Sequence, residues 1–183
     1  MKKIISFLFL ICCLSIISCN DSKDIDRLEE YMSIYIPRTI EKSTTLQTVP
    51  LVKNNVNFVE LSGLDFKRDT TFVLGVYCGG TVAPSEDVHV KLALETDSLV
   101  SLQKKNVPQS VYVQLPENFY SIDNWNVIIP KGRENGYLNI DLKLSQIPAR
   151  SKYILPVRID NISKYALNPE MSFILLAINK PDK

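Results

Sequence analysis

The sequence has 183 residues, with 21 Lys and Arg, 20 Asp and Glu, one His, four Cys and a formal net charge of +1. A nearly neutral chain without a basic run lacks the clustered basic face that nucleic-acid binding requires, which excludes that class of partner. One histidine and so few thiols supply neither the ligands of a metal site nor a Ser-His-Asp or Cys-His arrangement. We therefore expect no catalytic residue, no metal, no cofactor and no enzyme activity.

Residues 1–18 are typical of an export signal, because a basic start precedes an apolar run from Ile4 to Ile17. The run is shorter than the roughly 20 apolar residues that a membrane span needs. Cys19 directly follows Ser18, and this arrangement resembles the lipobox of bacterial lipoproteins. The resemblance implies a lipid on Cys19 and an anchor in the outer membrane, which two or more acyl chains make stable. The alternative is an ordinary cleaved secretory signal followed by an incidental cysteine.

Residues 19–30 carry five carboxylates against two basic side chains, and they are too polar to bury an apolar core. We interpret this segment as a flexible tether. Acidic residues soon after a lipidated cysteine also resemble the surface-export signal of Bacteroidota lipoproteins. That resemblance implies the cell surface rather than the periplasmic face of the outer membrane, whereas the simpler interpretation is that the charges only aid solubility.

Beyond the tether, apolar residues recur with a period of two, which indicates β-strands with one solvated face. The clearest alternations are Val88–Leu94 and Tyr137–Leu144. The run from Phe173 to Ile178 is apolar throughout and predicts a central strand covered on both faces. Residues 98–105 are the one stretch that indicates a short helix. Further strands are expected at 33–37, 57–61, 71–78, 110–115, 127–130 and 153–159.

Turn residues separate these strands, for example Gly79-Gly80 and Asn135-Gly136. Many short strands without βα alternation predict an all-β protein, most simply an immunoglobulin-like antiparallel β-sandwich over residues 31–179 with a tail at 180–183. If the signal is removed and Cys19 is lipidated, only Cys78 remains inside the domain. The sandwich is then held without a disulfide, and Cys78 is most simply a small buried residue.

Aromatic side chains gather around the polar loop that separates two expected strands. Sugar-binding surfaces often combine a flat ring with amide and carboxylate partners. The candidate glycan-contact residues are Tyr120, Asp123, Asn124, Trp125 and Asn126. The alternative, which we favour, is that Tyr120 and Trp125 pack over the edge of the sandwich with their polar tips in water.

Two triplets match the loose acceptor pattern of Bacteroidota protein O-glycosylation, an Asp followed by Ser or Thr and then by an apolar residue or Thr. They are Asp69-Thr70-Thr71 and Asp97-Ser98-Leu99, which makes Thr70 and Ser98 candidate acceptors. Triplets this short also arise often by chance.

A succession of strand and turn motifs extends over roughly residues 31–178. They are Val76-Tyr77-Cys78-Gly79-Gly80, Tyr112-Val113-Gln114-Leu115-Pro116, Phe119-Tyr120, Ile129-Pro130-Lys131-Gly132 and Tyr153-Ile154-Leu155-Pro156-Val157-Arg158-Ile159. In this order they resemble Bacteroidota surface lipoproteins with an immunoglobulin-like N-terminal domain of unknown function. In that family the domain usually precedes glycosidase or sugar-binding modules, and its loci often belong to SusC/SusD-type glycan-uptake systems. The resemblance supplies no catalytic residue.

The sequence ends at Lys183, soon after the last expected strand, and leads us to expect no catalytic or lectin module here. The favoured hypothesis is a lipid-anchored, non-enzymatic protein of the cell envelope that binds glycan or scaffolds a glycan-utilisation system. Its expected partners are the outer membrane, host or dietary glycans, and a SusC/SusD-type or glycosidase protein. The alternative is a structural spacer or an adhesion or fimbrial accessory.

Overall fold

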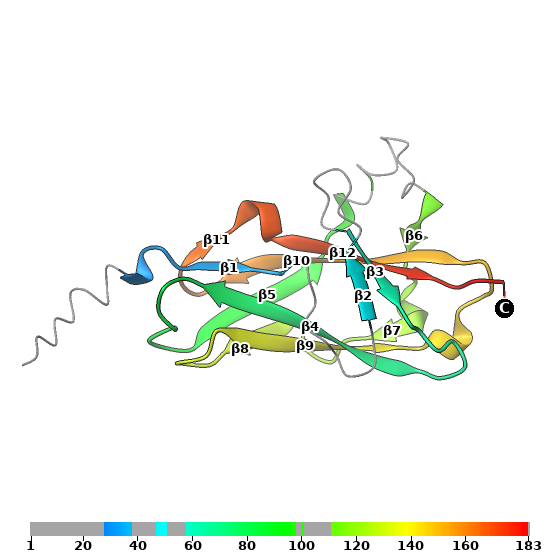
Figure 1. The fold of residues 1–183 in the computed structure, drawn as a ribbon, viewed down its shortest axis with the longest axis horizontal. Coiled ribbons are helices and arrows are strands. Elements are labelled where there is room, and N and C mark those ends of the chain that lie inside the picture. The colour runs from blue at the N-terminus through cyan, green and yellow to red at the C-terminus, as the bar shows by residue number, and fades with distance from the viewer. Residues whose placement is uncertain (1–27, 38–46, 51–57, 98–99, 101–110, 183) are drawn as a thin grey trace, which may run out of the picture.

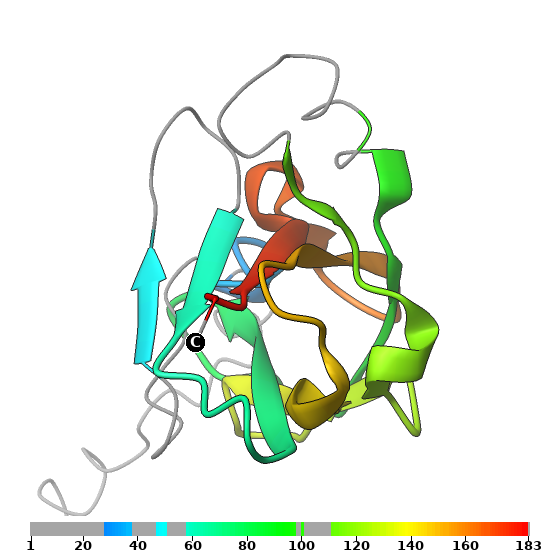
Figure 2. The same cartoon turned by 90° about the vertical axis from the view of Figure 1, so that its right-hand side faces the viewer.

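The computed structural model describes residues 28–37, 47–50, 58–97, 100 and 111–182, which form two β-sheets packed face to face (Figures 1 and 2). The five-stranded sheet contains, in spatial order, β11 (Ala166–Leu167), β1 (Ser33–Tyr35), β4 (Thr70–Gly79), β9 (Asn135–Leu142) and β7 (Tyr120–Ser121). The seven-stranded sheet contains β2 (Gln47–Pro50), β3 (Phe58–Ser62), β12 (Phe173–Asn179), β10 (Lys152–Ile162), β5 (Val88–Leu94) and β8 (Asn126–Ile129), with β6 (Val113–Gln114) beside β10. Three single-turn 3-10 helices are η3 (Glu117–Phe119), η4 (Leu144–Gln146) and η5 (Pro169–Met171).

The predicted immunoglobulin-like sandwich is confirmed. An immunoglobulin domain holds strands A, B and E in one sheet and strands C, F and G in the other. Here β1, β4 and β9 neighbour one another in one sheet, as do β5, β10 and β12 in the other. Most pairs are antiparallel, but β1 with β11, β3 with β12, and β6 with β10 are parallel pairs that the antiparallel prediction did not include.

The core lies between the sheets and follows the alternation in the sequence. In β9 every second residue is buried, and in β4 the inward side chains Phe72, Leu74 and Val76 are fully buried. They belong to the same hydrophobic cluster as Leu155 and Val157 of β10 in the opposite sheet. The free thiol of Cys78 is also buried here, as expected, so it forms no disulfide between the two sheets.

Strand β12 is central and covered on both faces, as its continuous apolar run predicted. It pairs with β10 on one side and β3 on the other. Ile174, Leu176 and Ile178 face the main core. On the other face, Leu175 and Ala177 join a second buried cluster with Phe58, Tyr112 and Ile154, in which the Phe58 and Tyr112 rings meet edge to face at 5.5 Å.

Several strands differ from the sequence prediction. Only Val113–Gln114 of the expected 110–115 strand pairs with β10, because β5 occupies the same edge of β10 from Val157 onward. Strands β2, β7 and β11 are two to four residues long and were not predicted. Most of the predicted helix at 98–105 lies outside the described residues.

The two sheets approach each other closely where β8 of one sheet leads through a turn into β9 of the other. A Cβ on Gly136 would lie 2.3 Å from the carbonyl oxygen of Ile128 and 2.7 Å from a methyl carbon of Val127. Backbone atoms of β8 therefore occupy the space that a side chain at position 136 would need. The glycine is required by this close approach and not by its φ angle.

The N-terminal segment is attached to the domain before β1 begins. Residues 28 and 29 start a helical turn, and the Glu29 carboxylate accepts hydrogen bonds from the Ser85 backbone N–H at 3.1 Å and pairs with Lys164 at 3.0 Å. The pKa of Glu29 is lowered from 4.5 to about 2, chiefly by a hydrogen bond with the Ser85 side chain and next by Lys164, with a smaller part from the Ser85 backbone N–H. Lys164 also pairs with Glu86 at 2.9 Å, and its pKa is raised. Residues 1–27, with the expected signal and most of the expected tether, lie outside the described residues.

We predict that Gly136→Ala destabilises the domain by about 2 kcal/mol or more, because backbone atoms of β8 must move to admit a methyl group. Urea unfolding of the soluble domain measures the change. Gly75→Ala is the matched control, since there the added methyl meets only the ring of Tyr77, which can rotate away. Equal loss in the two variants would contradict the assignment of the constraint to the β8–β9 corner.

We predict that Glu29 stabilises the fold in a pH-dependent way. Its folded pKa of about 2 lies below the ordinary 4.5, so its contribution is complete above pH 4.5 and is lost as the pH falls toward 2. The stability difference between wild type and Glu29→Gln should therefore be constant at neutral pH and shrink below about pH 4.5. Glu30→Gln, which removes an exposed neighbouring charge, is the control, and a difference that stays constant down to pH 2 would refute the prediction.

Candidate functional site

A shallow open groove runs along the side of the sandwich, between β5 and the segment that leads from η3 to β8. Its cavity volume is about 570 Å³. The floor is mostly apolar, and three polar side chains, Lys91, Glu117 and Ser121, lie along it. The remaining lining residues are Leu92, Ala93, Leu94, Tyr120, Ile122 and Trp125.

Two of the five predicted glycan-contact residues, Tyr120 and Trp125, line this groove. Trp125 is partly buried against the core, and its backbone carbonyl accepts a hydrogen bond from the Leu92 N–H at 2.8 Å, which fixes the loop to β5. Tyr120 is only 8% exposed, and burial, with the nearby Glu117 carboxylate, raises its pKa. The two rings therefore pack over the edge of the sandwich and also line the groove.

The other three predicted contact residues, Asp123, Asn124 and Asn126, are exposed and do not line the groove. Asn124 uses its side-chain oxygen within the loop, where it accepts from the backbone N–H of Asn126 at 3.0 Å and from its side-chain amide at 2.8 Å. These two amides shape the turn that presents Trp125.

The polar groups of the groove were not predicted from the sequence. Lys91 comes from β5 and lies 3.6 Å from Asp160 of β10, which in turn accepts from Arg158 at 2.6 Å. Lys91 meets the tryptophan only through the pairing of β5 with β8 and β10, a long-range arrangement that no local pattern indicates. Glu117 lies in the first turn of η3, eight residues before Trp125 in the sequence.

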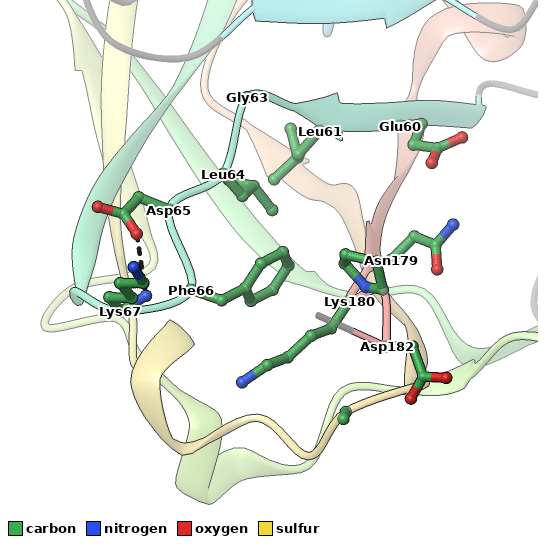
Figure 3. A pocket seen from close by; sticks show the side chains of 12 residues that line it. Glu60, Leu61, Gly63, Leu64, Asp65, Phe66, Lys67, Asn179, Lys180 and Asp182 are labelled. Carbon is green, nitrogen blue, oxygen red and sulfur yellow. Dashed lines mark hydrogen bonds between the residues drawn. The ribbon is translucent and has the colours of Figure 1, made fainter.

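A second hollow, of about 600 Å³, lies at the C-terminal end of β12 (Figure 3). Leu64 and Phe66 point into it from the loop after β3, and the Lys180 side chain extends beneath the ring, with its ammonium 5.3 Å from the Phe66 centroid. That ammonium also donates to the Ile147 carbonyl at 2.5 Å, and Asp65 accepts from Arg68 at 2.9 Å. Lys180 and Asp65 are therefore engaged within the protein, which suits a structural role for these two side chains.

The titratable groups singled out in the sequence lie apart. Cys78 is 2% exposed, and burial raises its pKa to about 11, which leaves it a neutral thiol at pH 7. His89 is exposed on β5. Among the described residues, no group of three or more His, Cys, Asp or Glu side chains is arranged to hold a metal ion.

The candidate modification sites divide between described and undescribed residues. Thr70 begins β4, and the adjacent Asp69 accepts hydrogen bonds from the backbone and hydroxyl of Ser145 at 3.1 and 2.7 Å. Ser98 and Cys19 lie outside the described residues. Within the described part of the chain, no helix has the length and apolar character of a bilayer span.

Comparison with solved structures finds the same fold in longer proteins of Bacteroides. A candidate carbohydrate-binding protein from Bacteroides ovatus matches with a TM-score of 0.57 and 18% identity, covering 81% of this chain and 37% of the other. A multidomain protein with a DUF1735 domain, also from B. ovatus, matches with a TM-score of 0.55 and 22% identity, covering 81% and 44%. An auxiliary nutrient-binding protein from Bacteroides thetaiotaomicron matches with a TM-score of 0.51 and 16% identity, covering 80% and 42%.

This chain thus spans less than half of each of these structures. No curated protein matches the sequence. A protein-family model described as an N-terminal domain matches residues 31–166, most of the sandwich. The resemblance found in the sequence is confirmed, and the chain belongs to the family of this immunoglobulin-like N-terminal domain.

Proposed function

We propose that this protein is a lipid-anchored, non-enzymatic component of the cell envelope that binds glycan for a glycan-utilisation system. The observation that supports it most directly is the groove that Trp125 and Tyr120 line. Carbohydrate-binding and nutrient-binding descriptions of proteins with the same fold agree with it, although those proteins are more than twice as long as the shared region.

The chemistry of the groove suits a sugar. The indole face of Trp125 offers an apolar surface for the C–H groups of a pyranose ring. Lys91, Glu117 and Ser121 provide donors and acceptors for hydroxyl groups around it. An apolar floor with a few polar groups is the usual composition of a small-ligand site.

The same groove gives little support for hydrolysis. A glycosidase places two carboxylates on either side of the bond that it cleaves. Glu117 is the one carboxylate among the residues that line the groove, which also include no histidine and no thiol. We therefore place the protein as a binding or scaffolding accessory, with a SusC/SusD-type or glycosidase protein as its expected partner.

The spacer or adhesion alternative is favoured by one feature of the fold. The described chain enters at one end of the long axis, near β1, and leaves at the opposite end, after β12 (Figure 1). A domain whose chain enters at one end and leaves at the other can hold the two parts attached to those ends apart.

We predict that Trp125→Ala weakens glycan binding by about tenfold, because it removes the ring that stacks on the sugar. Native affinity gels containing yeast α-mannan, mucin glycans or released host N-glycans measure this as lost retardation. Tyr31→Ala is the matched control, since Tyr31 is 77% exposed near the N-terminal end of the domain. Absence of retardation of the wild type in every gel would favour the spacer.

We predict that lipidation depends on Cys19. In the native host, labelled palmitate should enter the wild type and Cys78→Ala but not Cys19→Ala, and only the last should leave the membrane fraction. The buried Cys78 serves as the control thiol. Incorporation of label into Cys19→Ala would overturn the anchor.

A further inference from the structure

A strip of tyrosines lies on the outer face of the five-stranded sheet, away from both hollows described above. Tyr35 of β1 pairs directly opposite Tyr77 of β4, and their rings stack with centroids 6.0 Å apart and planes 27° from parallel. Tyr137 of β9 stands opposite Gly75 of β4 and is 55% exposed. All three residues alternate with buried core residues of their strands, which places them on the solvent side.

Two glycines of β4 leave room on the surface of the sheet for the rings of Tyr77 and Tyr35. A Cβ on Gly75 would lie 2.7 Å from the Tyr77 ring, and a Cβ on Gly79 would lie 2.8 Å from the Tyr35 ring. Each ring therefore occupies the position of a missing side chain, and Gly75 is buried although it faces outward. Together the rings cover β4 from Gly75 to Gly79, a length of about 13 Å at the usual rise of a strand.

Three described neighbours of the strip on its own sheet carry polar, uncharged side chains. Asn135 and Asn139 flank Tyr137 on β9, where Asn135 pairs opposite Tyr77 and Asn139 opposite Val73. Ser33 pairs opposite Gly79. Tyr137 is thus an exposed ring beside the Tyr35–Tyr77 pair, and two amides and one hydroxyl edge the three tyrosines among the described residues.

We propose that this strip, defined by Tyr35, Tyr77 and Tyr137, is a second glycan-binding surface, which takes two or three consecutive sugars of an uncharged chain. The apolar faces of successive sugars would lie on the rings, and their hydroxyl groups would reach Asn139 and Ser33. This inference rests on the proposed glycan-binding function but uses a different face of the domain from the Trp125 groove.

A protein partner suits the strip less well. A fully buried aromatic side chain contributes roughly 150–250 Å², and a stable protein interface needs about 800 Å² from each partner. Three tyrosines, two of them already partly buried, fall short of that area. Neither of the two described hollows includes them.

The test compares Tyr137→Ala, Tyr137→Phe and Gly75→Ala with the wild type in native gels containing yeast α-mannan, hydroxyethyl cellulose or laminarin. Tyr137→Ala should raise the Kd for the retained polysaccharide about tenfold, whereas Tyr137→Phe, which keeps the ring, should bind within about twofold of wild type. Gly75→Ala should also weaken binding, since it lifts the Tyr77 ring without removing an aromatic residue. Unfolding curves for each variant confirm that the domain is intact.

The outcomes separate the two glycan surfaces. Loss of retardation in Trp125→Ala together with wild-type behaviour of Tyr137→Ala and Gly75→Ala would overturn the strip and leave the groove standing. Loss of retardation in Tyr137→Ala and Gly75→Ala, together with wild-type behaviour of Trp125→Ala, would support the strip and contradict glycan binding in the groove. Wild-type protein that binds none of the polysaccharides, or a Tyr137-dependent affinity for a proline-rich peptide instead, would overturn the proposal.

Discussion

The architecture depends on one corner, where the backbone of β8 passes over Gly136 of β9. Because this position has no side chain, the carbonyl of Ile128 and a methyl of Val127 come close enough to exclude even a Cβ. The chain leaves one sheet and enters the other within the few residues of the 130–134 turn. This close approach sets the distance between the two sheets on this side of the sandwich. That distance determines how tightly the core side chains of β4, β5 and β9 pack together.

The opposite side of the sandwich is organised by β12, which is buried on both faces. Its odd and even residues contribute to two clusters, one between the sheets and one on the outside of the seven-stranded sheet. A slip by one residue would exchange the side chains of the two clusters, so the packing of both clusters specifies the register of β12. The described domain has no disulfide. The burial of β12 on both faces and the close contact at the β8–β9 corner stabilise it instead, as cross-links do in many small secreted domains.

The sequence was sufficient to predict the fold class and the longer strands, because alternation and the apolar run of β12 are local signals. It did not predict β7 or β11, which have two residues each and exist only because a neighbouring strand provides an edge. The aromatic pair Tyr120 and Trp125 was identified from the sequence, but Lys91 was not, since strand pairing brings it beside the ring. Glu117 is near Trp125 in sequence but was not singled out, because one carboxylate in a loop carries no distinctive pattern. The tyrosine strip was missed for a related reason: Tyr35, Tyr77 and Tyr137 are distant in sequence, and only the register of β1, β4 and β9 aligns them.

The opposed ends of the domain have a mechanical consequence. If Cys19 carries the proposed acyl anchor, the eight residues 20–27 that separate it from the described domain have a contour length of about 30 Å at most. The domain end nearest to that anchor is the one where Glu29 contacts Ser85 and Lys164. A pulling force between the proposed anchor and the domain would therefore act first on these contacts and on the β1–β4 ladder.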